Sequence, residues 1–120
     1  MIKISLDEAF VFDMLSIHDI KRQKLKDDKS ILTNKKFNDL CLEISSQIGH
    51  DKFSDILNSI EYKKMCEANS KVFELVDLCK TDNGLAKMTD DANYERFLRK
   101  IDLQNKFFDQ KISEVKSRDS

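Results

Sequence analysis

A pair of carboxylates at helical spacing is the part of this sequence best suited to metal chemistry. Glu74 and Asp77 form an E-x-x-D pattern, and residues three apart lie on one face of a helix. Several carboxylate oxygens together can hold a Mg²⁺ ion. Glu43, on the helix expected upstream, is the third ligand in this interpretation.

All-α nucleotide pyrophosphohydrolases of the MazG and dUTPase type are similar in this one respect. They carry E-x-x-D on one helix and E-E-x-x-E on an upstream helix, and they act with magnesium. Here the doubled upstream pair is missing, because that region supplies only Asp39 and Glu43. We therefore favour a solvated helix face for Glu74 and Asp77, and keep a Mg-dependent enzyme of this type as the alternative.

Asp13 lies on an otherwise apolar helical face. Burial of an unpaired carboxylate is costly, so Asp13 is either a metal ligand or general base with a raised pKa, or one half of an ion pair. We favour the ion pair, with Arg96 or Arg99 as its partner. The apolar residues that share its face are Leu6, Phe10, Ile17 and Ile20.

His18 follows Asp13 on the same segment and is the second polar residue that folding alone does not explain. Beside Asp19 it has the chemistry of a ligand or proton shuttle, but a lone helical histidine is more often a surface or packed residue. A zinc site is disfavoured because the histidines and cysteines lack paired-ligand spacing. We expect free, buried thiols and a reducing compartment; the cysteines are Cys41, Cys66 and Cys79.

The basic run KRQKLK, residues 21–26, forms the one basic patch together with Lys35 and Lys36. Such a patch can contact phosphate. Cations are also expected at the C-terminus of a helix, where they complement its dipole. We favour the second interpretation, in which the run serves helix stability and solubility.

Composition predicts a single domain, residues 1–120, built from long helices. The chain has 120 residues, no proline and only two glycines, Gly49 and Gly84, so turn-forming residues are scarce. Its 21 basic and 22 acidic side chains nearly cancel, which does not suggest a nucleic-acid partner. The longest apolar run, AFVF, is far shorter than the ~20 residues that span a bilayer. We expect no membrane partner and a cytoplasmic location.

The helical elements are placed by apolar periodicity and capping signals. Ser5 and Glu8 form a capping box that opens a helix to about residue 27. A connection over 28–33 leads to a helix that Gly49 ends. A third segment begins at Asp51 and bends or breaks near 61–62. A loop over 81–91 precedes the last helix, expected to reach Lys116, with a frayed tail at 117–120.

The last helix carries a heptad seam with a polar residue, Asn105, at a core position. Such a residue fixes helix register and partner number, so Asn105 serves either self-association or an intramolecular seam. Phe107 and Phe108 widen the apolar face for burial or for dimerisation. The other seam residues are Tyr94, Leu98, Ile101, Ile112 and Val115. The predicted fold is all-α, an elongated bundle or coiled-coil hairpin of four to five helices with long first and last helices.

Three segments resemble an uncharacterised family of small helical proteins of bacteria and phages. The family opens with S-L-G-E and D-x-L-S-I-L-E-I-K patterns, to which SLDE (5–8) and DMLSIHDIK (13–21) are similar. ANSKVFELVD (68–77) and NYERFLRKIDL (93–103) resemble its later segments. The resemblance implies an all-helical fold and no particular activity.

Three functions follow, in order of preference. The first is a cytoplasmic, non-catalytic interaction or assembly module without a cofactor, acting as a homodimer or on a protein partner. The second is the Mg-dependent enzyme, with Glu43, Glu74 and Asp77 as ligands. The third is a phage-type accessory protein that binds a host factor.

Overall fold

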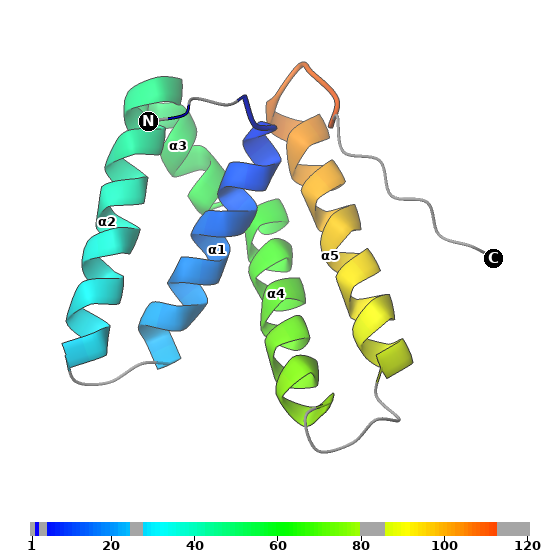
Figure 1. The fold of residues 1–120 in the computed structure, drawn as a ribbon. Coiled ribbons are helices and arrows are strands. Elements are labelled where there is room, and N and C mark those ends of the chain that lie inside the picture. The colour runs from blue at the N-terminus through cyan, green and yellow to red at the C-terminus, as the bar shows by residue number, and fades with distance from the viewer. Residues whose placement is uncertain (1, 3–4, 25–27, 80–85, 113–120) are drawn as a thin grey trace.

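The computed structural model describes residues 2, 5–24, 28–79 and 86–112. Within them the chain forms five α-helices and no strand, which confirms the predicted all-α class (Figure 1). The helices are α1 (Glu8–Lys24), α2 (Asp28–Ile48), α3 (His50–Leu57), α4 (Ile60–Cys79) and α5 (Ala86–Phe107).

Helix α1 is the centre of the bundle and contacts α2, α4 and α5. In Figure 1 it runs between α2 on one side and the α4–α5 pair on the other. Helices α4 and α5 form the most extensive pair, and α3 bridges α2 and α4. Among the described helices α2 is therefore peripheral, and it packs mainly against α1 and α3.

The apolar core lies where α1 crosses α3, α4 and α5. Phe12 is almost fully buried, and its ring centroid lies 6.1 Å from that of Phe53 and 6.3 Å from that of Phe108. Aromatic pairs at such separations stabilise a core beyond the area they bury. The other fully buried core residues are Ala9, Leu15, Ile56, Met65 and Leu103.

The predicted break in the middle of the chain is confirmed, a few residues earlier than expected. Helix α3 ends at Leu57 and α4 begins at Ile60. The Ser59 hydroxyl accepts a hydrogen bond from the Tyr62 amide at 3.1 Å, which satisfies one of the unpaired N–H groups at the start of α4. Gly49 ends α2 as predicted, with φ 95°, a conformation that favours glycine.

Replacing Ser59 by alanine is expected to lower the free energy of unfolding by about 1 kcal/mol, because the Tyr62 amide loses its cap. Urea denaturation followed by circular dichroism measures the change. Ser46→Ala is the matched control, since the Ser46 hydroxyl only donates to the Glu43 carbonyl inside α2. An equal loss in both variants would show that Ser59 is not a cap.

Several predicted boundaries are wrong. Residues 28–33, expected to connect two helices, are the first turns of α2. Thr33 and Asn34, which would have been plausible N-caps for a helix starting after residue 33, bond back to Lys29 and Ser30 inside the helix. Serine, threonine and asparagine side chains can either cap a helix start or bond back to the preceding turn inside a helix, so their type alone does not locate a helix start.

The ends of the outer helices also differ from expectation. Helix α1 begins at Glu8, not Ser5, and α5 begins at Ala86, inside the expected loop. Helix α5 ends at Phe107, and residues 108–112 are not helical. Residues 80–85 of the loop and the expected stretch from 113 through the tail lie outside the described residues.

Candidate functional site

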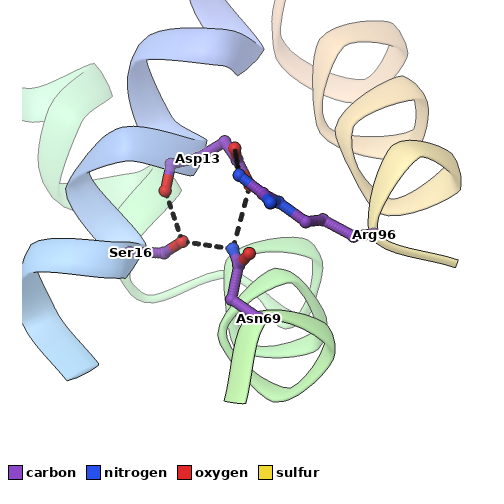
Figure 2. A network of polar contacts seen from close by, with 4 residues as sticks. All are labelled: Asp13, Ser16, Asn69 and Arg96. Atoms are coloured by element: carbon purple, nitrogen blue, oxygen red, sulfur yellow. Dashed lines mark hydrogen bonds and ion pairs between the residues drawn. The ribbon is translucent and has the colours of Figure 1, made fainter. Parts of the chain in front are cut away.

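Asp13 is the most deeply buried charge among the described residues, with 1% of its surface exposed. It lies on α1 and faces Arg96 of α5 (Figure 2). Arg96 Nη2 donates to Asp13 Oδ2 at 2.6 Å, and Arg96 Nε donates to Oδ1 at 3.1 Å. This two-pronged pairing is the strongest form of arginine–carboxylate contact. The predicted ion pair, with Arg96 rather than Arg99, is confirmed.

Two further polar residues complete the cluster around Asp13. The Asn69 amide, from α4, donates to Asp13 Oδ1 at 2.9 Å and to the Ser16 hydroxyl at 2.7 Å. The Ser16 hydroxyl donates to the Asp13 carbonyl at 2.7 Å. Neither Ser16 nor Asn69 was predicted from the sequence. Their only signal was a small polar side chain inside an apolar helical pattern.

The polar groups of this cluster are paired with one another. Both carboxylate oxygens of Asp13 already accept hydrogen bonds, and Ser16 and Asn69 are fully buried. A buried charge must be paired in this way if it is to be tolerated. The cluster therefore joins α1, α4 and α5 by polar contacts that require one relative placement of the three helices.

Gln104 forms a second polar junction, at the N-terminus of α1. Its Oε1 accepts from the Ala9 amide at 2.9 Å, while its Nε2 donates to Glu8 Oε2 at 2.6 Å and to the Gln110 carbonyl at 2.8 Å. The Ser5–Glu8 capping box was predicted to serve this helix end. That prediction is wrong for Glu8, because its carboxylate contacts Gln104 of α5 instead.

The predicted heptad seam of the last helix is also wrong. Asn105 is exposed, whereas its neighbours Leu103 and Gln104 are fully buried. Successive helical residues point about 100° apart, so α5 is rotated relative to the expected seam. This excludes the intramolecular role for Asn105 and leaves self-association through it untested.

Phe107 and Phe108 are half-buried and pack against the core. The ring of Phe108 lies near Phe12, and the Lys52 ammonium sits 4.4 Å from its centroid. Of the two roles predicted for this aromatic pair, burial within the bundle is the one these contacts support.

The candidate magnesium ligands do not converge in the described part of the chain. Glu43 lies exposed on α2, where its Oε1 accepts a hydrogen bond from Gln47 at 3.0 Å. Glu74 lies exposed on α4, and the side chain of Asp77 is outside the described residues. Among the described side chains, no three histidine, cysteine or acidic groups lie close enough to hold a metal ion.

The described cysteines are poor nucleophiles. Cys41 and Cys66 are free and half-buried. Burial raises the pKa of the Cys66 thiol to about 11, and burial followed by the Asp19 charge raises the pKa of Cys41. Because the thiolate is the reactive form, both thiols are protonated at neutral pH. The side chain of Cys79 is outside the described residues.

His18 lines a cavity of about 440 Å³ formed by α1, α2 and α4. Its Nδ1 is buried and has no hydrogen-bond partner among the described residues. Burial, then the charges of Lys21 and Lys36, lowers the pKa of the imidazole, so His18 is neutral at pH 7.

A larger depression of about 660 Å³ between α4 and α5 carries mixed charges, including Glu67, Lys71 and Glu95.

These features define an all-helical bundle with two polar junctions and a cationic cavity. Comparison of the chain with protein-family models, curated proteins and solved structures finds no match. No helix within the described residues has both the length and the apolar character needed to cross a membrane.

Proposed function

We propose that this protein is a helical assembly module that self-associates through the outer face of α2. Helix α2 has 21 residues, yet among its described side chains only Ile44 is buried. Three of its aliphatic residues are strongly exposed: Ile31 at 71%, Leu32 at 57% and Leu42 at 69%. Single exposed aliphatic residues are ordinary, but three on one peripheral helix favour an interface.

The exposed residues follow a helical register. Leu32, Lys35, Asp39 and Leu42 are spaced by three, four and three residues, which places them along one stripe of the helix. We call these four residues the outer stripe. All four are exposed, and the stripe lies on the opposite side of α2 from Ile44.

The observation that carries the proposal is that the outer stripe is complementary to itself. When two copies of α2 pair antiparallel about residue 37, Leu32 of one copy lies beside Leu42 of the other. Lys35 likewise lies beside Asp39. Each contact then occurs twice, as an isologous two-fold interface requires. Parallel pairing would instead place Lys35 against Lys35 and Asp39 against Asp39, which is unfavourable.

The rest of the chain is compatible with such pairing. The net charge is only −1, so two copies do not repel each other strongly. Apolar contact supplies most of the affinity, and the Lys35–Asp39 pairs select the antiparallel orientation. Coiled-coil pairs use flanking charges in the same way.

A charge-reversal experiment tests the proposal. The wild-type protein is expected to form a dimer in sedimentation equilibrium, and Lys35→Asp and Asp39→Lys are each expected to be monomeric. Mixing the two variants in equal amounts is expected to yield a heterodimer, because every contact then joins opposite charges. The doubly reversed chain, Lys35→Asp with Asp39→Lys, is expected to form the homodimer again.

Asp55→Lys is the control, since Asp55 is exposed on α3 and the substitution changes the net charge by the same amount as Asp39→Lys. This control is expected to remain dimeric. A wild-type chain that stays monomeric at high concentration would contradict the proposal. Dimeric single variants would show that another surface makes the dimer, such as one containing Asn105.

A further inference from the structure

The cavity beside His18 is surrounded by positive charge. Lys21 and Lys24 reach it from α1, and Lys36 reaches it from α2. Among the described residues that line it there is no carboxylate, although the chain as a whole carries slightly more acidic than basic groups. The remaining lining residues are His18, Ile20, Thr33 and Phe73.

Helix stability explains only part of this arrangement. Lys21 and Lys24 belong to the last turn of α1, where cations complement the helix dipole. Lys36 comes from the N-terminal half of α2, where a cation gains nothing from the dipole of its own helix. The three lysines are exposed and line one cavity, where a bound anion would be attracted by all three charges.

The neutral groups of the cavity complete a binding surface for such an anion. Thr33 supplies a hydroxyl, although in this structure it donates to the Lys29 carbonyl at 2.8 Å. His18 contributes an imidazole ring to the lining. Imidazole, hydroxyl and ammonium groups together are typical phosphate-binding groups.

One wall of the cavity is apolar. Ile20 is buried, and the half-buried ring of Phe73 lies 5.8 Å from the Lys24 ammonium. A ligand with a flat apolar part could pack on Phe73 while its phosphates meet the lysines. Ligand sites commonly combine an apolar wall with a few polar groups in this way. A cavity of about 440 Å³ accommodates a small molecule.

We propose that this cavity, lined by His18, Lys21, Lys24 and Lys36, binds a small phosphorylated molecule with a flat apolar portion, such as a nucleoside diphosphate. The site is independent of the proposed self-association, because none of these four residues belongs to the outer stripe of α2.

Isothermal titration calorimetry with adenosine diphosphate and with inorganic pyrophosphate tests the proposal, without added metal ions. Both probes are expected to bind the wild-type chain, and adenosine diphosphate more tightly because its base packs on Phe73. Lys36→Gln is expected to weaken the binding of both probes about tenfold, the usual effect of losing one charge-assisted hydrogen bond. Phe73→Leu is expected to weaken adenosine diphosphate alone.

Lys63→Gln, exposed on α4 away from the cavity, is the matched control and is expected to bind as the wild type does. Lys36→Gln should unfold at the same or a higher temperature than the wild type, so its weaker binding cannot be attributed to misfolding. The proposal is overturned if neither probe binds, or if Lys36→Gln and Lys63→Gln behave alike. It is also overturned if a single-stranded oligonucleotide binds through these lysines while both small probes do not.

Discussion

Replacing Arg96 by methionine is expected to lower the free energy of unfolding by about 3–5 kcal/mol, because it leaves a buried carboxylate without its counter-charge. Asp13 is 1% exposed and cannot turn toward water. The loss is large for a chain of this size, whose total stability is on the order of 5–15 kcal/mol. Urea denaturation at neutral pH measures it.

Replacing Asp13 and replacing Arg96 are expected to lower the free energy of unfolding by different amounts. The Arg96 side chain is 27% exposed, so in an Asp13→Asn variant the guanidinium can reach solvent. That variant should therefore lose less stability than Arg96→Met. Combining Asp13→Asn with Arg96→Met should recover part of the loss, because no unpaired charge then remains buried.

Arg99→Met is the control for this prediction. Arg99 pairs with Glu95 and Asp102, which are 52% and 49% exposed, and such surface pairs contribute about 0–1 kcal/mol. If Arg96→Met and Arg99→Met both lowered the free energy of unfolding by less than about 1 kcal/mol, the buried cluster would contribute no more to stability than a surface ion pair.

Gln104→Leu is expected to lower the free energy of unfolding by about 1–3 kcal/mol, the cost of leaving a buried donor unsatisfied. The donor is the Ala9 amide, in a residue that is fully buried. The Glu8 carboxylate loses its partner as well, but it is half-exposed and can be hydrated. Leucine is close to glutamine in size, so the loss reports on hydrogen bonding more than on packing.

Asn105→Leu is the matched control for Gln104→Leu, because the two residues are adjacent in sequence, and Asn105 is exposed whereas Gln104 is buried. Its expected effect on stability is within about 0.5 kcal/mol, as for most surface substitutions. Denaturation curves of the two variants compare the effects directly. A clear gain in stability for Asn105→Leu, as expected when leucine replaces a polar residue in a buried seam, would favour the predicted seam over the observed register of α5.

The polar junctions were only partly predictable from the sequence. A carboxylate inside an apolar helical pattern requires a counter-charge, and that requirement alone pointed to Arg96 or Arg99. Nothing in the sequence joined Asn69 to the cluster, because it lies more than fifty positions from Asp13 and Ser16 and meets them only through helix packing. Gln104 was not predicted for the same reason, since Glu8 and Ala9, two of its partners, lie on α1.

What the sequence by itself determined is the helical class, the end of α2 at Gly49 and the break before α4. These follow from local causes: scarce turn residues, periodic apolar positions and the backbone freedom of glycine. Tertiary structure alone decided how each helix is rotated, and therefore that Gln104 and not Asn105 is buried. It also decided that Lys36 joins Lys21 and Lys24 around one cavity. Rotation depends on the side chains of several helices packing at once, and a single helix's pattern does not contain that information.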